Sequence, residues 1–344
     1  MPLLPFLERV VNRENLTDDE AEHAMSEILN PEASVALIAA FLVALKMKGE
    51  TADELYGFAK AMRHKVIHVD PDLGDERLLD TCGTGGDGSG TFNISTVVAI
   101  VVAGAGVRVA KHGNRSISSR CGSADVLEAL GVNIALEPHQ MAQSIRETGI
   151  GFLFAPSLHP AMRHAQPARR ELKMRTAFNL LGPLANPAGA TAQLIGAPSV
   201  EAAQLMASAL ARLGLEHGFV VNGADVGDEI STTGPTRVFE VRPNSVEEHV
   251  WTPETFGLPL ANASDLLGGD VDQNAAIAHA IFRGEKGPKR DIVLANAAAA
   301  LVVSGKAATL IEGVAIAVSA IDSGAAARKL GALIRFTQTC TFSE

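Results

Sequence analysis

A glycine-rich loop and the basic residues that follow it are the part of this sequence best equipped for chemistry. The loop reads Asp80-Thr81-Cys82-Gly83-Thr84-Gly85-Gly86-Asp87, and the next stretch, Gly88 to Ala124, contains no aspartate or glutamate although the formal net charge is −10 at pH 7. That stretch keeps Arg108, Lys111, His112, Arg115 and Arg120. Glycines let backbone N–H groups approach an anion, and the start of a helix favours negative charge. The pattern predicts a binding site for a multiply charged anion, of which phosphate is the simplest candidate.

Two predicted strands bring the loop and the basic residues to one edge of a sheet. Residues 77–80 form a strand candidate before the loop, and residues 107–110 form the next one. Between them, Asn93-Ile94-Ser95-Thr96 opens an apolar helix that ends near Gly104, although these residues could also be simple N-caps. Lys111 to Ser119 follow the second strand, where His112 taken by itself would be an ordinary loop histidine. Because ligands of open α/β sheets gather at the carboxyl ends of the strands, we expect the two segments to lie together.

The remaining pattern predicts a small N-terminal helical domain and a larger α/β domain. The first 65 residues contain two capping boxes, Thr17 to Glu20 and Thr51 to Glu54, and the apolar helix candidate 33–47. Strand candidates at 218–221 and 237–241 then alternate with a helix capped by Ser199 and helices at 275–282 and 296–305. Such alternation favours a central, mostly parallel sheet flanked by helices. We expect residues 1–68, with part of 160–186, to form the helical domain and residues 69–344 the α/β domain.

The composition argues against membrane and nucleic-acid partners. Of the 344 residues, 47% are hydrophobic and 20% are charged, and the apolar runs are far shorter than the about 20 residues that span a bilayer. The N-terminus lacks the pattern of a secretory signal. Cys82, Cys121 and Cys340 give neither a disulfide framework nor a zinc spacing, so we expect a cytoplasmic protein. The acidic balance is the opposite of the broad basic surface that nucleic acid requires.

Three motifs have more than one interpretation. Gly83 to Gly88 matches the G-x-G-x-x-G pattern of dinucleotide-binding folds, but after the motif no acid follows until Asp125, and the helix begins late. The loop could also be a tight turn without a ligand. Asp228-Glu229 could hold Mg²⁺, which prefers one or two carboxylates with water and substrate phosphates, or could form an exposed acidic turn. The arginines of 159–187 are, by charge pattern, typical of a solvated helix face.

Taken together, these motifs resemble the anthranilate phosphoribosyltransferase family of tryptophan biosynthesis. The resemblance covers nearly the whole chain. It is carried by Lys46 to Thr51, Asp80 to Gly88, Asn93 to Thr96, Lys111 to Ser119, Gly122 to Glu128, Phe178 to Pro187 and the pair Asp228-Glu229. Pyrimidine nucleoside phosphorylases share the fold and the glycine loop, but they lack the stretches His112 to Arg115 and Asn179 to Pro187.

The resemblance implies a reaction and the residues that bind its substrates. A member of this family transfers the phosphoribosyl group of phosphoribosyl pyrophosphate (PRPP) to the amine of anthranilate and releases pyrophosphate. PRPP would contact Gly83, Gly86, Asp87, Thr91, Asn93, Ile94, Ser95, Thr96, Lys111, His112, Gly113, Asn114, Arg115, Ser116, Ile117, Ser118, Ser119 and Ser123. Anthranilate would face Gly83, His112, Asn114, Arg169 and Pro183. Ser95, Asp228 and Glu229 would serve Mg²⁺, and the helical domains would form a homodimer.

The implied chemistry depends on positioning more than on a base. The neutral aromatic amine needs no deprotonation before attack, and the difficult step is the departure of highly charged pyrophosphate. Lys111, His112 and Arg169 would be the catalytic residues, with His112 orienting the substrate. The turn before Asp228 departs from the family, which usually has His-Gly where this chain has Asn222-Gly223. A nucleoside phosphorylase-like enzyme, or a non-catalytic phosphate- or nucleic-acid-binding relative of the same fold, is the alternative.

Overall fold

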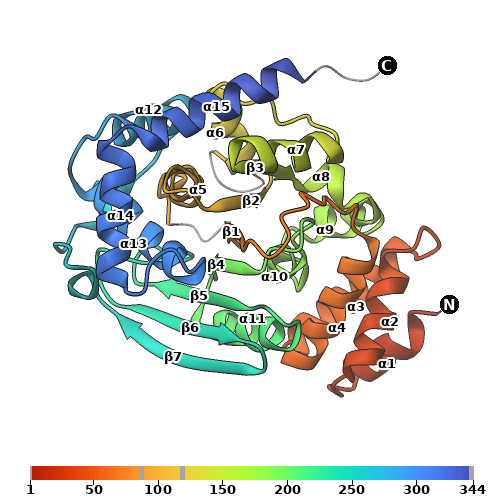
Figure 1. The fold of residues 1–344 in the computed structure, drawn as a ribbon. Coiled ribbons are helices and arrows are strands. Elements are labelled where there is room, and N and C mark those ends of the chain that lie inside the picture. The colour runs from red at the N-terminus through yellow and green to blue at the C-terminus, as the bar shows by residue number, and fades with distance from the viewer. Residues whose placement is uncertain (1, 86–88, 117–120, 341–344) are drawn as a thin grey trace.

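The chain folds into an N-terminal helical bundle joined to a larger α/β domain (Figure 1). The structure is a computed structural model and describes residues 2–85, 89–116 and 121–340. The bundle helices are α1 (Leu4–Val11), α2 (Asp18–Ile28), α3 (Val35–Lys48) and α4 (Ala52–Lys65). Thr17 and Thr51 form the two predicted capping boxes, each with the glutamate three residues further on, and Gly49 ends α3 at a φ of 90°.

A buried ion pair ties the turn between α3 and α4 to the chain that leads into α2. The Lys48 ammonium donates to a Glu54 carboxylate oxygen at 2.9 Å and to the Asn15 side-chain oxygen at 3.0 Å. The other Glu54 oxygen accepts the backbone N–H of Leu16 at 3.0 Å. The Lys48 and Glu54 side chains are 4% and 0% exposed. Because removing one member of such a pair leaves an uncompensated buried charge, the pair holds this corner of the bundle in one arrangement.

The α/β domain is built on a sheet in which the described strands run in the order β3-β2-β1-β4-β5-β6-β7. The strands are β1 (Leu78–Gly83), β2 (Arg108–Gly113), β3 (Ile150–Phe154), β4 (Ala192–Gly196), β5 (His217–Gly223), β6 (Thr236–Arg242) and β7 (Ser245–Trp251). The first five in this order pair in parallel, while β6 and β7 pair antiparallel. The prediction of a mostly parallel sheet beside a helical domain is confirmed.

The two strands at the site are longer than the sequence pattern predicted. Strand β1 continues to Gly83 because residues 79–83 pair with β4. Strand β2 continues to Gly113 because Lys111 and His112 pair with Phe152 and Leu153 of β3. Placing Lys111, His112 and Gly113 in a loop after the strand was therefore wrong: neighbouring strands extend the ladder beyond the apolar residues that reveal it in the sequence.

Helices cover both faces of the sheet (Figure 1). They are α5 (Ile94–Gly104), α6 (Ser123–Ala129), α7 (Pro138–Thr148), α8 (Ala155–Leu158), α9 (Gln166–Leu172), α10 (Phe178–Leu181), α11 (Val200–Arg212), α12 (Val271–Phe282), α13 (Pro288–Val303), α14 (Leu310–Asp322) and α15 (Ala325–Thr339). Short 3₁₀ turns occupy Pro160–His164, Pro183–Ala185, Pro253–Phe256 and Ala263–Leu266. Helix α13 begins before the predicted residue 296, with Pro288 in its first turn.

Alternate residues of the central strands β1, β4 and β5 face opposite sides of the sheet and pack into different cores. Leu79, Leu194 and Val221 pack with α5 and α13 on one face. Cys82, Ile195 and Val220 pack on the other face with α11, the bundle helices and residues of α9 and α10. This period of two is that of strands buried on both faces. The bundle therefore shares a core with part of 160–186, while the proposed boundary at residue 68 stays a prediction.

No single helix within the described residues is long and apolar enough to cross a membrane. The bent pair α14–α15 reaches that length and composition only when both helices are counted together. Their Ile321, Leu330 and Leu333 side chains are buried in the core of the α/β domain.

The strand order predicts a ligand-binding position beside β1. The chain adds strands on one side of β1 as far as β3 and then returns to its other side with β4. Ligands of open α/β sheets bind outside the carboxyl ends of the strands at such a switch point. Here the two strands at that point end in Gly83 and Gly196, so the fold directs attention to the glycine loop and to the chain that packs on it.

Candidate functional site

The buried carboxylate of Asp80, within β1, joins three segments of the chain. One oxygen accepts the backbone N–H of His112 at 3.1 Å, and the other accepts the Asn186 side-chain amide at 2.7 Å. The Asn186 amide also donates to the backbone oxygen of Ala110 at 3.0 Å. Burial raises the pKa of Asp80, although the nearby Lys111 acts in the opposite direction. Asp80 thereby connects β1, β2 and the chain after α10, a role that the sequence analysis missed.

Lys111 and His112 are buried neighbours that face different partners. The Lys111 ammonium donates to the Thr81 backbone oxygen at 2.5 Å and to the Ser95 hydroxyl at 3.3 Å. Burial lowers the pKa of Lys111, and the charge of Asp80 opposes that change. The His112 and His159 rings face each other with their Nε2 atoms 3.2 Å apart. Burial lowers the pKa of His112 to about 3 and that of His159 to about 4. Both imidazoles are therefore neutral near pH 7, and one Nε2 can donate to the other.

The acidic turn lies directly against the glycine loop. The Asp228 carboxylate accepts the backbone N–H of Gly85 at 2.9 Å. A Cβ atom at Gly83 would come within 2.3 Å of an Asp228 carboxylate oxygen, and one at Gly196 within 1.6 Å of the Asp228 backbone oxygen. Side chains at either position would push the turn away, so both strands must end in glycine for the acid to reach the loop.

Glu229 connects the same turn to the start of α5. Its carboxylate accepts the backbone N–H of Ser95 at 3.1 Å. Ser95, Asp228 and Glu229 all line one small cavity, together with residues at the ends of β1 and β4. The structure therefore brings together the three residues expected to serve Mg²⁺, and their oxygen atoms suit that ion. Within the described residues there is no group of three or more His, Cys, Asp or Glu side chains that could form a metal cage, so substrate and water oxygens would complete the coordination.

Asn296 of α13 fixes the backbone after the acidic pair. Its side-chain oxygen accepts the N–H of Ile230 at 3.0 Å, and its amide donates to the backbone oxygen of Ile230 at 3.0 Å. Asn296 is fully buried and also lines the cavity beside Asp228 and Glu229. The sequence analysis did not select this residue, because an asparagine within an Ala-rich helix carries no local signal of its partner.

Arg175 is a third residue whose place at the site the sequence analysis missed. Its guanidinium donates to the Gly85 backbone oxygen at 2.8 Å and to the Thr84 hydroxyl at 3.3 Å. One of the arginines from the basic 159–187 segment therefore holds the glycine loop rather than facing only solvent.

The start of α5 presents buried polar atoms whose partners are incomplete. The Asn93 amide donates to the Cys121 backbone oxygen at 3.2 Å, while its side-chain oxygen is buried without a hydrogen-bond partner among the described residues. Thr96 has a similarly unpartnered hydroxyl, but it lines a different small cavity beside Lys111 and Phe152. Ile94 is buried in the core, and Thr91 forms an isolated bridge with Leu267. Because a buried polar atom without a partner is costly, the Asn93 oxygen is the one here best suited to a ligand donor.

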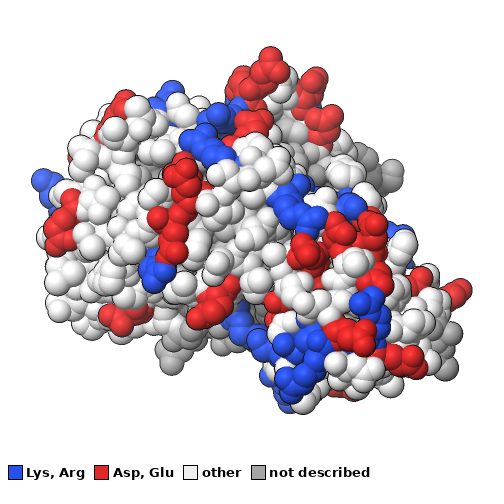
Figure 2. All heavy atoms as spheres, turned by 90° about the horizontal axis from the view of Figure 1, so that it is seen from below, with Lys and Arg blue, Asp and Glu red and all other residues white. Residues whose placement is uncertain are grey.

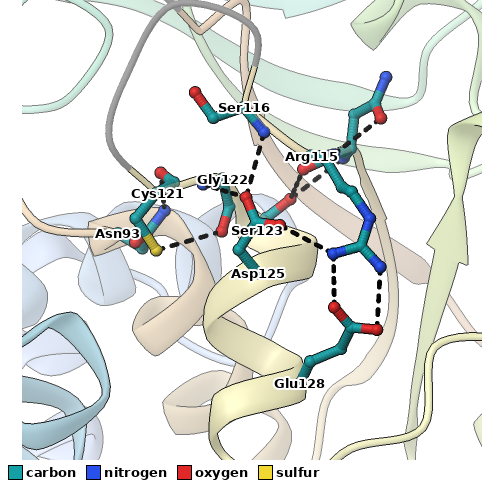
Figure 3. Close-up of polar contacts among 9 residues, drawn as sticks. Asn93, Arg115, Ser116, Cys121, Gly122, Ser123, Asp125 and Glu128 are labelled. Atoms are coloured by element: carbon teal, nitrogen blue, oxygen red, sulfur yellow. Dashed lines mark hydrogen bonds and ion pairs between the residues drawn. The ribbon is translucent and has the colours of Figure 1, made fainter. Parts of the chain in front are cut away.

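The segment after β2 is held against the start of α6, as Figure 3 shows. The Ser123 hydroxyl accepts the Asn114 backbone N–H at 3.2 Å and donates to the Asn114 backbone oxygen at 3.2 Å. Arg115 forms ion pairs with Asp125 and Glu128 of α6. Gly113 approaches Ser123 so closely that a Cβ atom would lie 2.3 Å from its hydroxyl. Gly86, Asp87, Ile117, Ser118 and Ser119 were also expected at the PRPP site, and they lie outside the described residues.

The candidate anthranilate residues come from two neighbouring segments. Arg169 of α9 is half-buried, and its guanidinium carbon lies 5.2 Å from the centre of the Phe178 ring. Arg170 is exposed. Burial lowers the pKa of Arg169. The Pro183 backbone oxygen accepts the Gln193 amide at 2.9 Å, and Gly182 beside it shares a hydrogen bond with His112. Pro183 thus directly follows a residue that contacts His112, and Arg169 contacts Phe178 in the helix before it.

Comparisons with known proteins cover both domains. The sequence model of the glycosyl transferase family, helical bundle domain, matches residues 4–66, and that of the glycosyl transferase family, a/b domain, matches residues 75–327. The anthranilate phosphoribosyltransferase of Solibacter usitatus (strain Ellin6076) is 62% identical over 336 residues, covering 98% of this chain and 99% of that protein. This chain belongs to the anthranilate phosphoribosyltransferase family. The resemblance found in the motifs is confirmed.

Solved structures of the family share the whole fold. The crystal structure of anthranilate phosphoribosyltransferase from Thermus thermophilus matches with a TM-score of 0.92 and 43% identity, covering 98% of this chain and 100% of that chain. The Saccharomyces cerevisiae enzyme in complex with PRPP and Mg matches with a TM-score of 0.88 and 27% identity, covering 98% of each chain. The same yeast enzyme in complex with 4-fluoroanthranilate matches with a TM-score of 0.86 and 27% identity, again covering 98% of each chain.

The neutral pair His112–His159 predicts a loss of stability in mild acid. Both folded-state pKa values lie below the ordinary 6.5. Between these values and pH 6.5 the unfolded chain is therefore protonated at both histidines while the folded chain is not. The contribution of the two histidines to the free energy of unfolding should be complete above about pH 6.5. It should decrease toward pH 4, by up to about 1.4 kcal/mol per pH unit for each histidine. Urea unfolding followed by the fluorescence of Trp251 at several pH values measures this slope.

Replacement of one member of the pair is the matched test. His159→Asn should flatten the slope between about pH 6.5 and 5, because one fewer imidazole must stay neutral. His139→Asn, on the exposed side of α7, should leave the slope unchanged. Equal slopes in all three proteins would contradict the assignment.

Proposed function

We propose that this chain transfers the phosphoribosyl group of PRPP to the amine of anthranilate, giving N-(5-phosphoribosyl)anthranilate and pyrophosphate. The observation that carries the proposal is the contact of the Asp228 carboxylate with the Gly85 backbone at the switch point of the sheet, in a chain 62% identical to a named member of the family. The family structures with PRPP and Mg and with 4-fluoroanthranilate support the choice of substrates.

PRPP would lie across the carboxyl ends of β1 and β2. The Gly83–Gly85 backbone, Asn93, Ser95, Lys111, Asn114 and Ser123 are the described polar groups around that edge, and preorganised donors there would stabilise the phosphate oxygens. The buried oxygen of Asn93 would accept a hydroxyl of the sugar. Arg175 and Asp228 support the loop from two sides, so its backbone is positioned before the substrate binds.

Ser95, Asp228 and Glu229 would hold Mg²⁺ next to the pyrophosphate. When bound, the ion would neutralise charge on the leaving group and orient it. The protein's own contribution is the close approach of the carboxylates, which Gly83, Gly196 and Asn296 make sterically and geometrically feasible. This arrangement supports magnesium use, because the two carboxylates would otherwise repel a polyphosphate.

Anthranilate would enter beside His112, Pro183 and Arg169. The amine is a neutral nucleophile, and the neutral His112 imidazole, whose hydrogen bonds go to His159 and Gly182, would present an uncharged surface beside it. Arg169 is the candidate partner for the carboxylate, because a guanidinium matches a carboxylate with two parallel hydrogen bonds. Catalysis would rest on bringing the amine and the anomeric carbon together rather than on a general base.

The surface argues against the nucleic-acid-binding alternative. On the face drawn in Figure 2, acidic and basic side chains are interspersed, and the Lys and Arg side chains form several separate groups rather than a continuous band. The formal net charge of −10 opposes a polyanion as large as nucleic acid. We further propose a cytoplasmic location, since the three cysteines, all within the described residues, form no disulfide.

The fluorescence of anthranilate provides the test of this function. With the protein, PRPP and Mg²⁺ all present, the anthranilate signal should disappear, and omission of any one component should preserve it. Asp228→Ala/Glu229→Ala should abolish the magnesium-dependent turnover, whereas Asp225→Asn in the same turn should stay active, because Asp225 is exposed and asparagine tolerates its φ of 61°. A fully active double variant would remove the metal assignment, and a wild-type protein that leaves anthranilate unchanged would remove the function.

Arg169 and its neighbour provide a test of anthranilate recognition. Arg169→Ala should raise the KM for anthranilate by about one to two decades, since a charge-assisted contact is worth roughly 1.5–3 kcal/mol, and should leave the KM for PRPP nearly unchanged. Arg170→Ala is the matched control, because Arg170 is exposed while Arg169 is half-buried. Equal small effects of both changes would contradict this role of Arg169, and recognition of the anthranilate carboxylate would then be assigned to Asn114 and backbone amides.

A homodimer through the helical bundle is the remaining part of the proposal. Helix α3 is apolar around most of its circumference, and Met47 at its end is 69% exposed. Val11 at the end of α1 is 61% exposed. A two-fold interface would cover such surfaces. Light scattering at micromolar concentration should report a dimer that Met47→Glu/Val11→Glu weakens, whereas Ile311→Glu on α14 should not. A monomeric wild type would refute the interface.

A further inference from the structure

The Arg115 side chain points toward two acidic residues of α6, Asp125 and Glu128 (Figure 3). Its guanidinium donates to an Asp125 oxygen at 2.9 Å and forms a two-pronged contact with Glu128, one bond of which measures 2.9 Å. Such a fork fixes the plane of the guanidinium as well as its position. The three charges sum to −1, so this cluster offers an anion no net positive charge.

The second oxygen of Asp125 gathers the chain on both sides of residues 117–120. It accepts the backbone N–H of Ser116 at 3.2 Å and that of Gly122 at 2.9 Å. One carboxylate therefore receives two backbone donors and one guanidinium. Although burial acts in the opposite direction, these hydrogen bonds hold the pKa of Asp125 below its usual value. The carboxylate therefore remains charged at neutral pH. We call its contacts with the Ser116 and Gly122 amides the Asp125 clamp.

The clamp operates where two chain segments approach unusually closely. A Cβ atom at Gly122 would lie 2.3 Å from the Ser116 nitrogen and 2.8 Å from the Asn114 oxygen. The backbone N–H of Ala124 also donates to the Asn114 oxygen at 3.2 Å. Asn114 and Ser123 are the residues assigned to the two substrates, so the close approach determines how they sit relative to each other.

We infer that Asp125, Arg115 and Glu128 form a positioning unit, which sets Asn114 and Ser123 for substrate binding, and that the Arg115 guanidinium serves this unit instead of binding the phosphates of PRPP. The inference deepens the proposed function and rests on it for the identity of the substrates. It replaces the role that the family resemblance implied for Arg115, and it adds two acidic residues to the machinery of the site.

A double-mutant cycle separates positioning from direct phosphate contact. If Arg115 acts through Glu128, Arg115→Ala and Glu128→Ala should each raise the KM for PRPP by roughly threefold to tenfold with kcat nearly unchanged, and the double variant should equal either single one. If Arg115 binds phosphate, Glu128→Ala should leave that KM unchanged or lower it, and Arg115→Ala should raise it in either background. The second pattern would overturn the inference. Glu147→Gln on α7, outside this cluster, serves as the control and should match the wild type.

Amide hydrogen exchange tests the clamp without any substrate. In the ligand-free protein, Asp125→Ala should accelerate exchange at the Ser116 and Gly122 amides by at least severalfold, because alanine removes the one oxygen that accepts both N–H groups. Exchange in the helical bundle should not change, which excludes general destabilisation. Unaltered exchange at those two amides would refute the clamp. An enzyme that does not consume anthranilate would refute the proposed function while leaving this exchange result in place, so the two failures are distinguishable.

Discussion

The buried carboxylate of Asp80 is the interaction on which the rest of the site depends. A carboxylate buried within a central strand is tolerated only when hydrogen bonds and a counter-charge replace water, and here His112, Asn186 and Lys111 supply them. Each of those partners begins another part of the site. The His112 contact sets the register in which Lys111 points toward Ser95, and the Asn186 contact fixes the chain that carries Pro183 and, further back, Arg175. The hydrogen bonds that the buried carboxylate requires thus hold three segments of the chain in fixed positions relative to one another.

A second constraint is the space that glycine leaves at the ends of β1 and β4. Asp228 occupies the volume that side chains at 83 and 196 would fill, and this explains how an acidic turn reaches an anion site without a long loop. The departure from the family before the acidic pair is accommodated in the same region. The Asn222 amide donates to the Ala197 backbone oxygen at 2.9 Å, while Gly223 and Gly227 bond to each other across the turn. The altered residues therefore still hold the carboxylates beside β4.

Local sequence patterns predicted the helices and strands more reliably than the contacts between elements that are distant in sequence. Capping boxes at Thr17 and Thr51 and the stop at Gly49 depend on residues a few positions apart, so they could be recognised directly. The extension of β2 through Lys111 and His112 depends on pairing with β3, which lies about 40 residues further along and has no local signature. Asn296, Arg175 and Asp125 were missed as positioning residues for the same reason: their partners are distant in sequence or are backbone groups. The family motifs could indicate which residues meet a substrate, but not which residues hold them in place.

The distribution of charge and hydrogen bonds explains how the site suits group transfer without a general base of the protein: the proton that the attacking nitrogen loses after the C–N bond forms would pass to pyrophosphate or to water. Lys111 donates to groups of the protein, His112 and His159 are neutral and paired with each other, and Arg115 is neutralised by two carboxylates. None of these described groups is arranged as a base with its proton acceptor aimed into the crevice. What the crevice does offer is backbone N–H groups of a supported loop, a buried acceptor at Asn93 and an oxygen-rich corner at Asp228 and Glu229. Such groups bind and orient a polyphosphate and its sugar, and a weakly basic aromatic amine requires little else of the protein once the leaving group is stabilised.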